Sequence, residues 1–124
     1  MELIRTMKET NIRIADFELF DEFVSIMGLG LLKCIRENIV DYWIAWDWLF
    51  NLRNQDILQK YKQSKKVKNA IDLATELDAA KKVLSTELYE KSISEIEEIF
   101  IKHIAKSVKE KPDKERGIFL CNKS

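Results

Sequence analysis

Nucleophilic or metal chemistry in this chain would have to be built on one histidine, His103, and two cysteines, Cys34 and Cys121. A thiol beside an imidazole can act as a nucleophile with its base, so a pair of either cysteine with His103 is formally available. A local metal pair is excluded, because no acid or histidine stands three or four residues from His103. We therefore expect His103 to be an ordinary residue at a helix surface or core edge, and we expect no bound metal.

Other catalytic signatures are missing from the sequence. The three glycines match neither the dinucleotide fingerprint nor the P-loop spacing. The carboxylates are typical of a helix surface, since Glu87 precedes Lys91 and Glu98 precedes Lys102 by four residues, the favourable order for an ion pair. We predict that the protein is not an enzyme and uses no cofactor.

The amino-acid composition predicts that the functional surfaces of the protein are built on helices. Three glycines and one proline in 124 residues are too few for the many corners of an all-β protein. The hydrophobic share of 46% is enough for one core. We predict an all-α fold, a compact bundle of four to five helices, and leave open a short β pairing of the termini. Residues 1–124 are expected to form a single domain, with 1–15 and 112–124 as irregular or short extended arms.

Apolar spacing predicts two helices in the first part of the chain. Asp16 is a candidate N-cap for the first helix, which Gly28-Leu-Gly30 ends or kinks. The second helix is predicted over 31–50. Its expected core stripe consists of Leu32, Ile35, Ile39, Trp43, Trp46 and Phe50.

The middle of the chain carries weaker signals. Asn51 and Asn54 predict a break before Asp56, which is a candidate cap for the next helix. We favour two helices, over 57–67 and 70–90, with one long rod as the alternative.

The final helix is expected to start at Ser92 or Ser94, because each has a glutamate three residues later, and to end at Pro112. Its predicted core face consists of Ile96, Phe100, Ile104 and Val108. The apolar segment 117–121 could pair as a short strand with residues 11–15, or lie on the bundle.

One surface that could bind a partner lies on the far side of the helix predicted over 31–50. At 100° per residue, Ile44 and Trp48 fall opposite the core stripe and one turn apart, so they touch if exposed. The predicted partner-binding residues are Glu37, Val40, Asp41, Ile44, Asp47 and Trp48. Apolar residues ringed by acids are typical of a hot spot for a basic protein. The alternative is a helix buried on both sides, with the acids at its edges.

A second candidate surface is a run of five lysines without an intervening acid: Lys60, Lys62, Lys65, Lys66 and Lys68. Such a run could contact the phosphates of a nucleic acid. It holds no arginine and has only Tyr61 as a nearby aromatic residue, which favours a solvated charge run instead. An acidic protein partner is the third interpretation.

Net charge and targeting signals indicate where in the cell the protein is expected. Basic and acidic residues number 21 each, so no overall field attracts nucleic acid or a membrane. Residues 1–58 carry six bases and ten acids, and residues 59–124 carry fifteen and eleven. The chain shows no secretory signal and no apolar run near the ~20 residues of a membrane span. We expect a cytoplasmic protein with reduced cysteines.

These observations together predict a non-enzymatic protein-binding module. The expected class is an inhibitor, immunity or antitoxin protein of bacterial or phage type that occludes a basic partner protein, such as a nuclease toxin. One alternative is a small nucleic-acid-associated regulator that uses Lys60–Lys68. The other is a structural subunit of a larger helical assembly.

Overall fold

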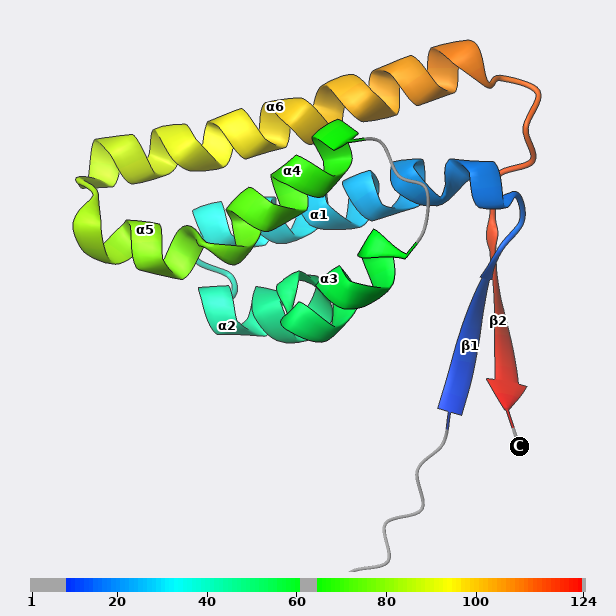
Figure 1. The fold of residues 1–124 in the computed structure, drawn as a ribbon, viewed down its shortest axis with the longest axis horizontal. Coiled ribbons are helices and arrows are strands. Elements are labelled where there is room, and N and C mark those ends of the chain that lie inside the picture. The colour runs from blue at the N-terminus through cyan, green and yellow to red at the C-terminus, as the bar shows by residue number, and fades with distance from the viewer. Residues whose placement is uncertain (1–8, 61–64, 124) are drawn as a thin grey trace, which may run out of the picture.

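A computed structural model describes residues 9–60 and 65–123 (Figure 1). Its elements, in chain order, are the strand β1 (Glu9–Ile14), the 3-10 turn η1 (Phe17–Leu19), α1 (Phe20–Arg36), α2 (Tyr42–Ala45), the π-helical turn η2 (Trp46–Phe50), α3 (Leu52–Gln59), α4 (Lys65–Thr75), α5 (Leu77–Val83), α6 (Thr86–Glu110) and β2 (Ile118–Lys123). The prediction of an all-α bundle with a short β pairing of the termini is confirmed.

The two long helices, α1 and α6, run antiparallel and form the framework of the bundle (Figure 1). The short helices α2 to α5 pack beside them, with α4 against both. The largest fully buried apolar side chains come from most of these helices: Leu32, Phe50, Val67, Ile71, Leu77, Ile93 and Phe100. Removing such side chains from water, at ~25 cal/mol per Å² of apolar area, is the main force that holds the helices together.

Gly28 permits the close approach of α1 and α6. A Cβ atom at this position would lie 2.7 Å from Cζ of Phe100, whereas one at Gly30 would meet nothing within 4 Å. The helix continues through both glycines to Arg36, so it does not end there as one of the two expectations had it. Glycine in a helix costs about 1 kcal/mol relative to alanine, a cost that tertiary packing overrides here.

The long helix predicted over 31–50 is interrupted. Helix α1 ends at Arg36, and Asn38 takes a left-handed conformation with φ of 58°. Asp41 then caps α2, because its side chain accepts a hydrogen bond of 3.1 Å from the backbone N–H of Ile44. Asparagine tolerates the left-handed region better than most residues, which suits it to the turn that stops the helix.

This interruption rotates the second half of the predicted core stripe. Ile39 and Trp43, expected in the core, are exposed, while Tyr42 and Ala45 take the buried positions. Only Leu32, Ile35 and Phe50 of the stripe are fully buried, and Trp46 is half-buried.

Helix boundaries in the middle of the chain also differ from expectation. Asn51 caps α3 by accepting a hydrogen bond from the N–H of Asn54, so Asp56 lies inside that helix rather than at its start. Helix α4 runs straight across the gap predicted between 67 and 70, and the short helix α5 follows it. The two predicted helices over 57–67 and 70–90 are therefore wrong in their limits.

The final helix starts earlier than predicted. Ser85 caps α6 by accepting a hydrogen bond of 3.2 Å from the N–H of Leu88. Ser92 and Ser94 lie within the helix, which ends at Glu110, just before Pro112 as expected. Of the predicted core face, Ile96 and Phe100 are buried, Ile104 is half-buried and Val108 is exposed.

Strands β1 and β2 form a two-stranded antiparallel ribbon that extends away from the bundle (Figure 1). The register places Ile12 opposite Leu120 and Ile14 opposite Ile118. This confirms the predicted pairing of the two terminal segments. Asp16, which follows β1, caps η1 as expected by accepting a hydrogen bond from the N–H of Glu18.

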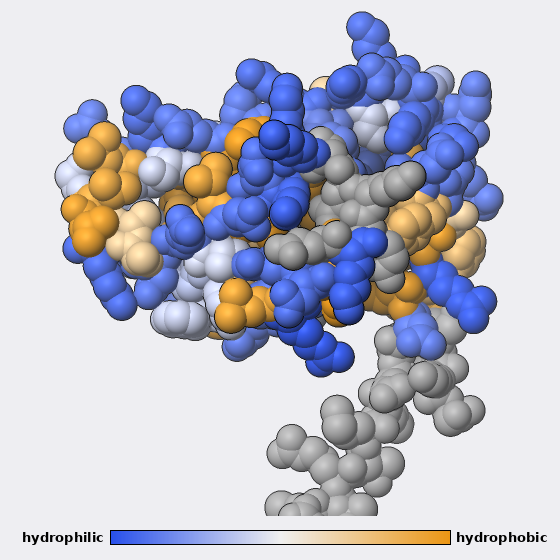
Figure 2. Space-filling view, in the orientation of Figure 1, coloured by the Kyte–Doolittle hydropathy of each residue, from blue (hydrophilic) through white to orange (hydrophobic). Residues whose placement is uncertain are grey.

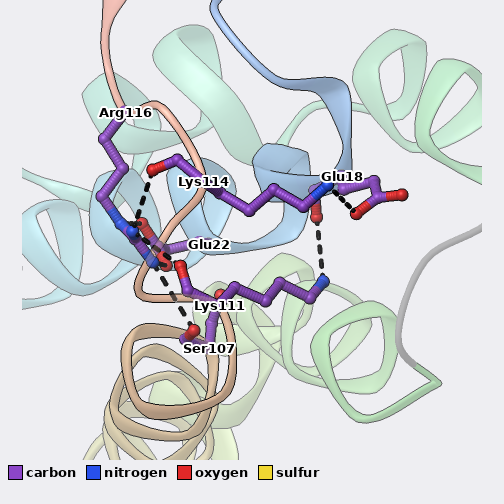
Figure 3. A network of polar contacts seen from close by, with 6 residues as sticks. All are labelled: Glu18, Glu22, Ser107, Lys111, Lys114 and Arg116. Atoms are coloured by element: carbon purple, nitrogen blue, oxygen red, sulfur yellow. Dashed lines mark hydrogen bonds and ion pairs between the residues drawn. The ribbon is translucent and has the colours of Figure 1, made fainter.

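A polar network fixes the base of this ribbon to the bundle (Figure 3). The Lys111 ammonium donates a 3.2 Å hydrogen bond to the carbonyl of Glu18, and Lys114 forms a 2.9 Å ion pair with the Glu18 carboxylate. Arg116, whose side chain lies on the other side of the network from Glu18, binds Glu22 on the first turn of α1. The network joins the segment after α6 to η1 and the start of α1.

Candidate functional site

Four large apolar side chains between positions 39 and 48 are exposed to solvent. Their exposed fractions are 67% for Ile39, 53% for Trp43, 42% for Ile44 and 68% for Trp48. We call these four residues the tryptophan patch. Grouped apolar side chains on a protein surface mark interaction sites more often than scattered ones do.

Within the π-helical turn η2, Trp48 is exposed whereas Phe50, two residues later, is fully buried. The Asn51 amide donates to the carbonyls of Trp46 and Asp47, at 3.1 and 3.3 Å. These bonds tie Asn51, which follows η2, back to the first two residues of the turn. Single π turns occur frequently at functional sites.

Trp43 stands on a cluster of aromatic rings. It meets Tyr42 edge-on at 5.0 Å and Trp46 at 5.7 Å between ring centroids. The Tyr42 hydroxyl donates a hydrogen bond to the carbonyl of Thr75, which ties α2 to the end of α4. Burial, followed by the nearby negative charge of Asp78, raises the pKa of Tyr42 to about 12. The exposed indole of Trp43 is therefore held on a packed base.

A groove of about 420 Å³ adjoins the patch, between the 37–41 turn, α2 and α5. Its lining includes Ile39, Val40, Asp41, Trp43, Ile44, Asp78, Lys81 and Tyr89. A neighbouring groove of about 320 Å³ shares Ile35, Asn38, Lys81 and Tyr89 with it and extends along the start of α6. Figure 2 shows hydrophobic surface at this end of the molecule, where α5 turns into α6.

The charged groups around the groove are of both signs. Asp78 forms a 3.3 Å ion pair with Lys82, and the Lys81 ammonium lies 6.0 Å from the centroid of the Tyr89 ring. Burial raises the pKa of Tyr89, and the charge of Asp78 adds to the effect. Asp41 is committed to capping α2 but remains exposed.

The structure brings only part of the predicted partner-binding set together. Val40, Asp41 and Ile44 line the groove, whereas Asp47 and Trp48 lie exposed on η2. The remaining member, Glu37, forms a 3.0 Å ion pair with Lys33 on α1. The exposure of Ile44 and Trp48 contradicts the alternative in which this side of the segment is buried.

Sequence reasoning missed Ile39 and Trp43, which it placed in the core, and Asp78, which it did not consider. The signal that could have found the first two is the pair Asn38 and Asp41. An asparagine that can stop a helix, followed three residues later by an aspartate that can start one, marks a break between two helices.

The structure describes four of the five lysines of the predicted run. Lys60, Lys65 and Lys66 are exposed, Lys68 is half-buried, and Lys62 lies outside the described residues. Lys65 and Lys66 line a groove with α6, where Lys102 and Lys106 join them.

The candidate pair of Cys34 and His103 is not assembled. Burial lowers the pKa of the half-buried His103, and the carboxylates of Asp21 and Glu22 act on it in the opposite direction. Those acids lie on the first turn of α1, whereas the free thiol of Cys34 lies about 18 Å further along the same helix at 1.5 Å per residue. The side chain of Cys121 lies outside the described part of the structure.

The described residues also bear on metal binding and on membrane spanning. No group of three or more His, Cys, Asp or Glu side chains within 9–60 and 65–123 is arranged to hold a metal ion. Within the same ranges, no helix combines the length and the apolar character needed to cross a membrane.

The comparisons with known proteins identify a family whose description states no function. No curated protein and no solved structure matches the chain. A family model matches residues 3–118, which is nearly the whole length. The chain therefore belongs to the family described as Protein of unknown function (DUF3969).

Proposed function

We propose that the protein is a non-enzymatic binding module that docks a partner protein through the tryptophan patch. The observation that carries this proposal is the exposure of two indoles and two isoleucines, of which Ile39, Trp43 and Ile44 line a groove. Tryptophan is the residue type most enriched at interface hot spots, because it buries a large area at low entropic cost.

The acids near the patch favour a partner with a basic face. Asp41 and Asp47 are exposed beside it, whereas Asp78 and Glu37 are already paired with lysines. The preference for a basic partner therefore depends mainly on Asp41 and Asp47. Charges at the rim of an interface steer association and exclude wrong partners more than they add affinity.

A module of this kind is suited to cover a functional face of another protein. We place it with inhibitor, immunity or antitoxin proteins of bacterial or phage type, acting in the cytoplasm on a partner such as a nuclease toxin. The support for this finer assignment is the size of the chain and the sequence's lack of a recognisable catalytic set.

The test is to identify the partner by capture with the full chain and then to measure affinity with purified proteins. Trp48→Ala should weaken binding by ~2 kcal/mol or more, about thirty-fold. Ile101→Ala, which removes an exposed isoleucine from α6, serves as the matched control and should leave affinity unchanged. Equal affinity for the Trp48→Ala variant and the parent would exclude the patch as the interface.

Charge reversal separates steering from contact. Asp47→Lys should slow association and reduce its sensitivity to salt, with little change in dissociation. Asp47 is preferable to Asp41 here, because the Asp41 side chain also caps α2. An association rate that does not respond to Asp47→Lys would argue against a basic partner.

A further inference from the structure

A separate groove of about 680 Å³ lies between the start of α4 and the later turns of α6. Its lining residues are Lys65, Lys66, Glu95, Glu98, Ile99, Lys102, His103 and Lys106. It shares no residue with the tryptophan patch, so its chemistry is independent of the proposed function.

The fold brings four ammonium groups to this groove from two segments that are distant in the sequence. Lys65 and Lys66 come from the first turn of α4, and Lys102 and Lys106 stand one turn apart on α6. The four lysines belong to helices that pack against each other.

Two carboxylates also line the groove and reduce its positive charge. Glu98 lies 3.8 Å from the ammonium of Lys102, an exposed i,i+4 ion pair. Glu95 stands nearly one turn earlier on α6. Four lysines against two glutamates still leave a positive groove, with Ile99 and the half-buried imidazole of His103 between them.

We propose that this groove binds a ligand that carries several adjacent phosphate groups, through the ammonium groups of Lys65, Lys66, Lys102 and Lys106. Lysine ammonium groups are compact charges that suit phosphate oxygens. Among the lining residues that the structure describes, none is an arginine that could hold a carboxylate in bidentate fashion. The charges on the described residues therefore favour recognition of phosphate groups.

His103 is a built-in reporter, because it is the only histidine in the chain. Its Cε1 proton gives a single imidazole signal in an NMR spectrum of the intact protein. A bound polyphosphate adds negative charge beside the ring and should raise the pKa of His103. Titration with inorganic tripolyphosphate at low salt should therefore move this signal to saturation and shift its pH titration upward.

Two quadruple variants test whether these lysines are the cause. Lys65→Gln, Lys66→Gln, Lys102→Gln and Lys106→Gln together should weaken tripolyphosphate binding by about ten-fold or more. The matched control makes the same change of charge elsewhere, with Lys33→Gln, Lys81→Gln, Lys82→Gln and Lys91→Gln, and should retain the parent's affinity. Circular dichroism of both variants checks that folding is intact.

The source of the phosphates is separated by a second probe, a single-stranded oligothymidylate. If the groove takes a nucleic-acid strand, this probe moves the His103 signal, tripolyphosphate competes with it, and log K falls with log salt with a slope of about −3. If only tripolyphosphate moves the signal, the ligand is a free polyphosphate. A His103 signal that neither probe moves, or an equal loss of binding in both quadruple variants, overturns the proposal.

Discussion

Arg116 holds the carboxylate of Glu22 with two parallel hydrogen bonds, from Nε to Oε2 and from Nη2 to Oε1, each 2.8 Å long (Figure 3). The two residues are 94 positions apart, and the Glu22 side chain is only 7% exposed. The remaining guanidinium nitrogen donates to the carbonyl of Lys111 at 3.0 Å. A bidentate arginine–carboxylate pair fixes orientation as well as distance, so this contact sets how the β ribbon leaves the bundle.

Replacing Arg116 should lower the stability of the fold and change how that stability depends on pH. Hydrogen bonds from Arg116 are the main reason that the pKa of Glu22 lies below its ordinary value of 4.5. A lowered carboxyl pKa adds stability that is present above pH 4.5 and is lost as the pH falls through the lower folded value. Arg116→Ala should lower the free energy of unfolding by about 2–3 kcal/mol at pH 7. On acidification the variant should then lose less stability than the parent does.

Urea unfolding of both proteins between pH 3 and pH 7 measures this difference. Lys114→Ala is the control, because its ion pair with Glu18 is solvent-exposed and should contribute less than ~1 kcal/mol. Equal costs for the Arg116 and Lys114 variants would show that the Glu22 contact is no stronger than a surface pair.

The two glycines of α1 should respond to alanine in opposite directions. Gly28→Ala places a methyl group against the Phe100 ring and should destabilise the protein by about 1–3 kcal/mol. Gly30→Ala meets open space on the same helix and should stabilise it by about 0.5–1 kcal/mol. Thermal unfolding of both variants tests the pair, and a Gly28→Ala variant as stable as the parent would contradict the close crossing.

The fold class could be read from the sequence because composition and periodicity are local signals. The scarcity of turn residues excluded an all-β chain, and alternation around Ile12 and Ile14 indicated the terminal strand. The break at 37–41 was missed because the spacing from Leu32 to Phe50 also fits one unbroken helix. Asn38 marks the break with its left-handed conformation, but an asparagine can also lie inside a continuous helix, so the residue alone does not decide between the two.

The candidate site shows the same limit. Trp48 was placed opposite the core stripe, with burial on both sides as the alternative, and it is exposed, but the straight helix used to place it also put Trp43 in the core. The pairing of Arg116 with Glu22 could not be predicted from the sequence, because each residue alone is an ordinary charged position. The groove between α4 and α6 likewise depends on how two distant helices meet.

Tyr42 should resist ionisation and contribute stability that disappears in strong alkali. Its pKa is raised to about 12, chiefly by burial, so the folded protein keeps the hydroxyl protonated where an unfolded chain has lost the proton. The contribution is complete below pH 10 and is lost as the pH rises from 10 towards 12. Ultraviolet titration of the unfolded proteins should show one tyrosine fewer ionising near pH 10 in the Tyr42→Phe variant than in the parent. The folded proteins should show no such difference near pH 10, because the folded parent keeps Tyr42 protonated there.

Tyr42→Phe should also destabilise the protein by about 1–2 kcal/mol at pH 7, because the carbonyl of Thr75 loses its side-chain donor. A variant whose stability equals that of the parent would indicate that water replaces the hydroxyl at no cost.

Trp48→Ala and Trp43→Ala should both cost little stability, unlike Phe50→Ala. Trp48 and Trp43 are 68% and 53% exposed, so each truncation removes mainly surface area and should cost below ~1 kcal/mol, the usual range for surface changes. Trp43→Ala should cost more stability than Trp48→Ala, because the Trp43 ring packs on Tyr42 and Trp46. Phe50 is fully buried, and its truncation should leave a cavity worth ~3–5 kcal/mol. Urea unfolding of the three variants measures the series. A cost for Trp48→Ala as large as that for Phe50→Ala would place Trp48 in the core and remove the tryptophan patch as a docking surface.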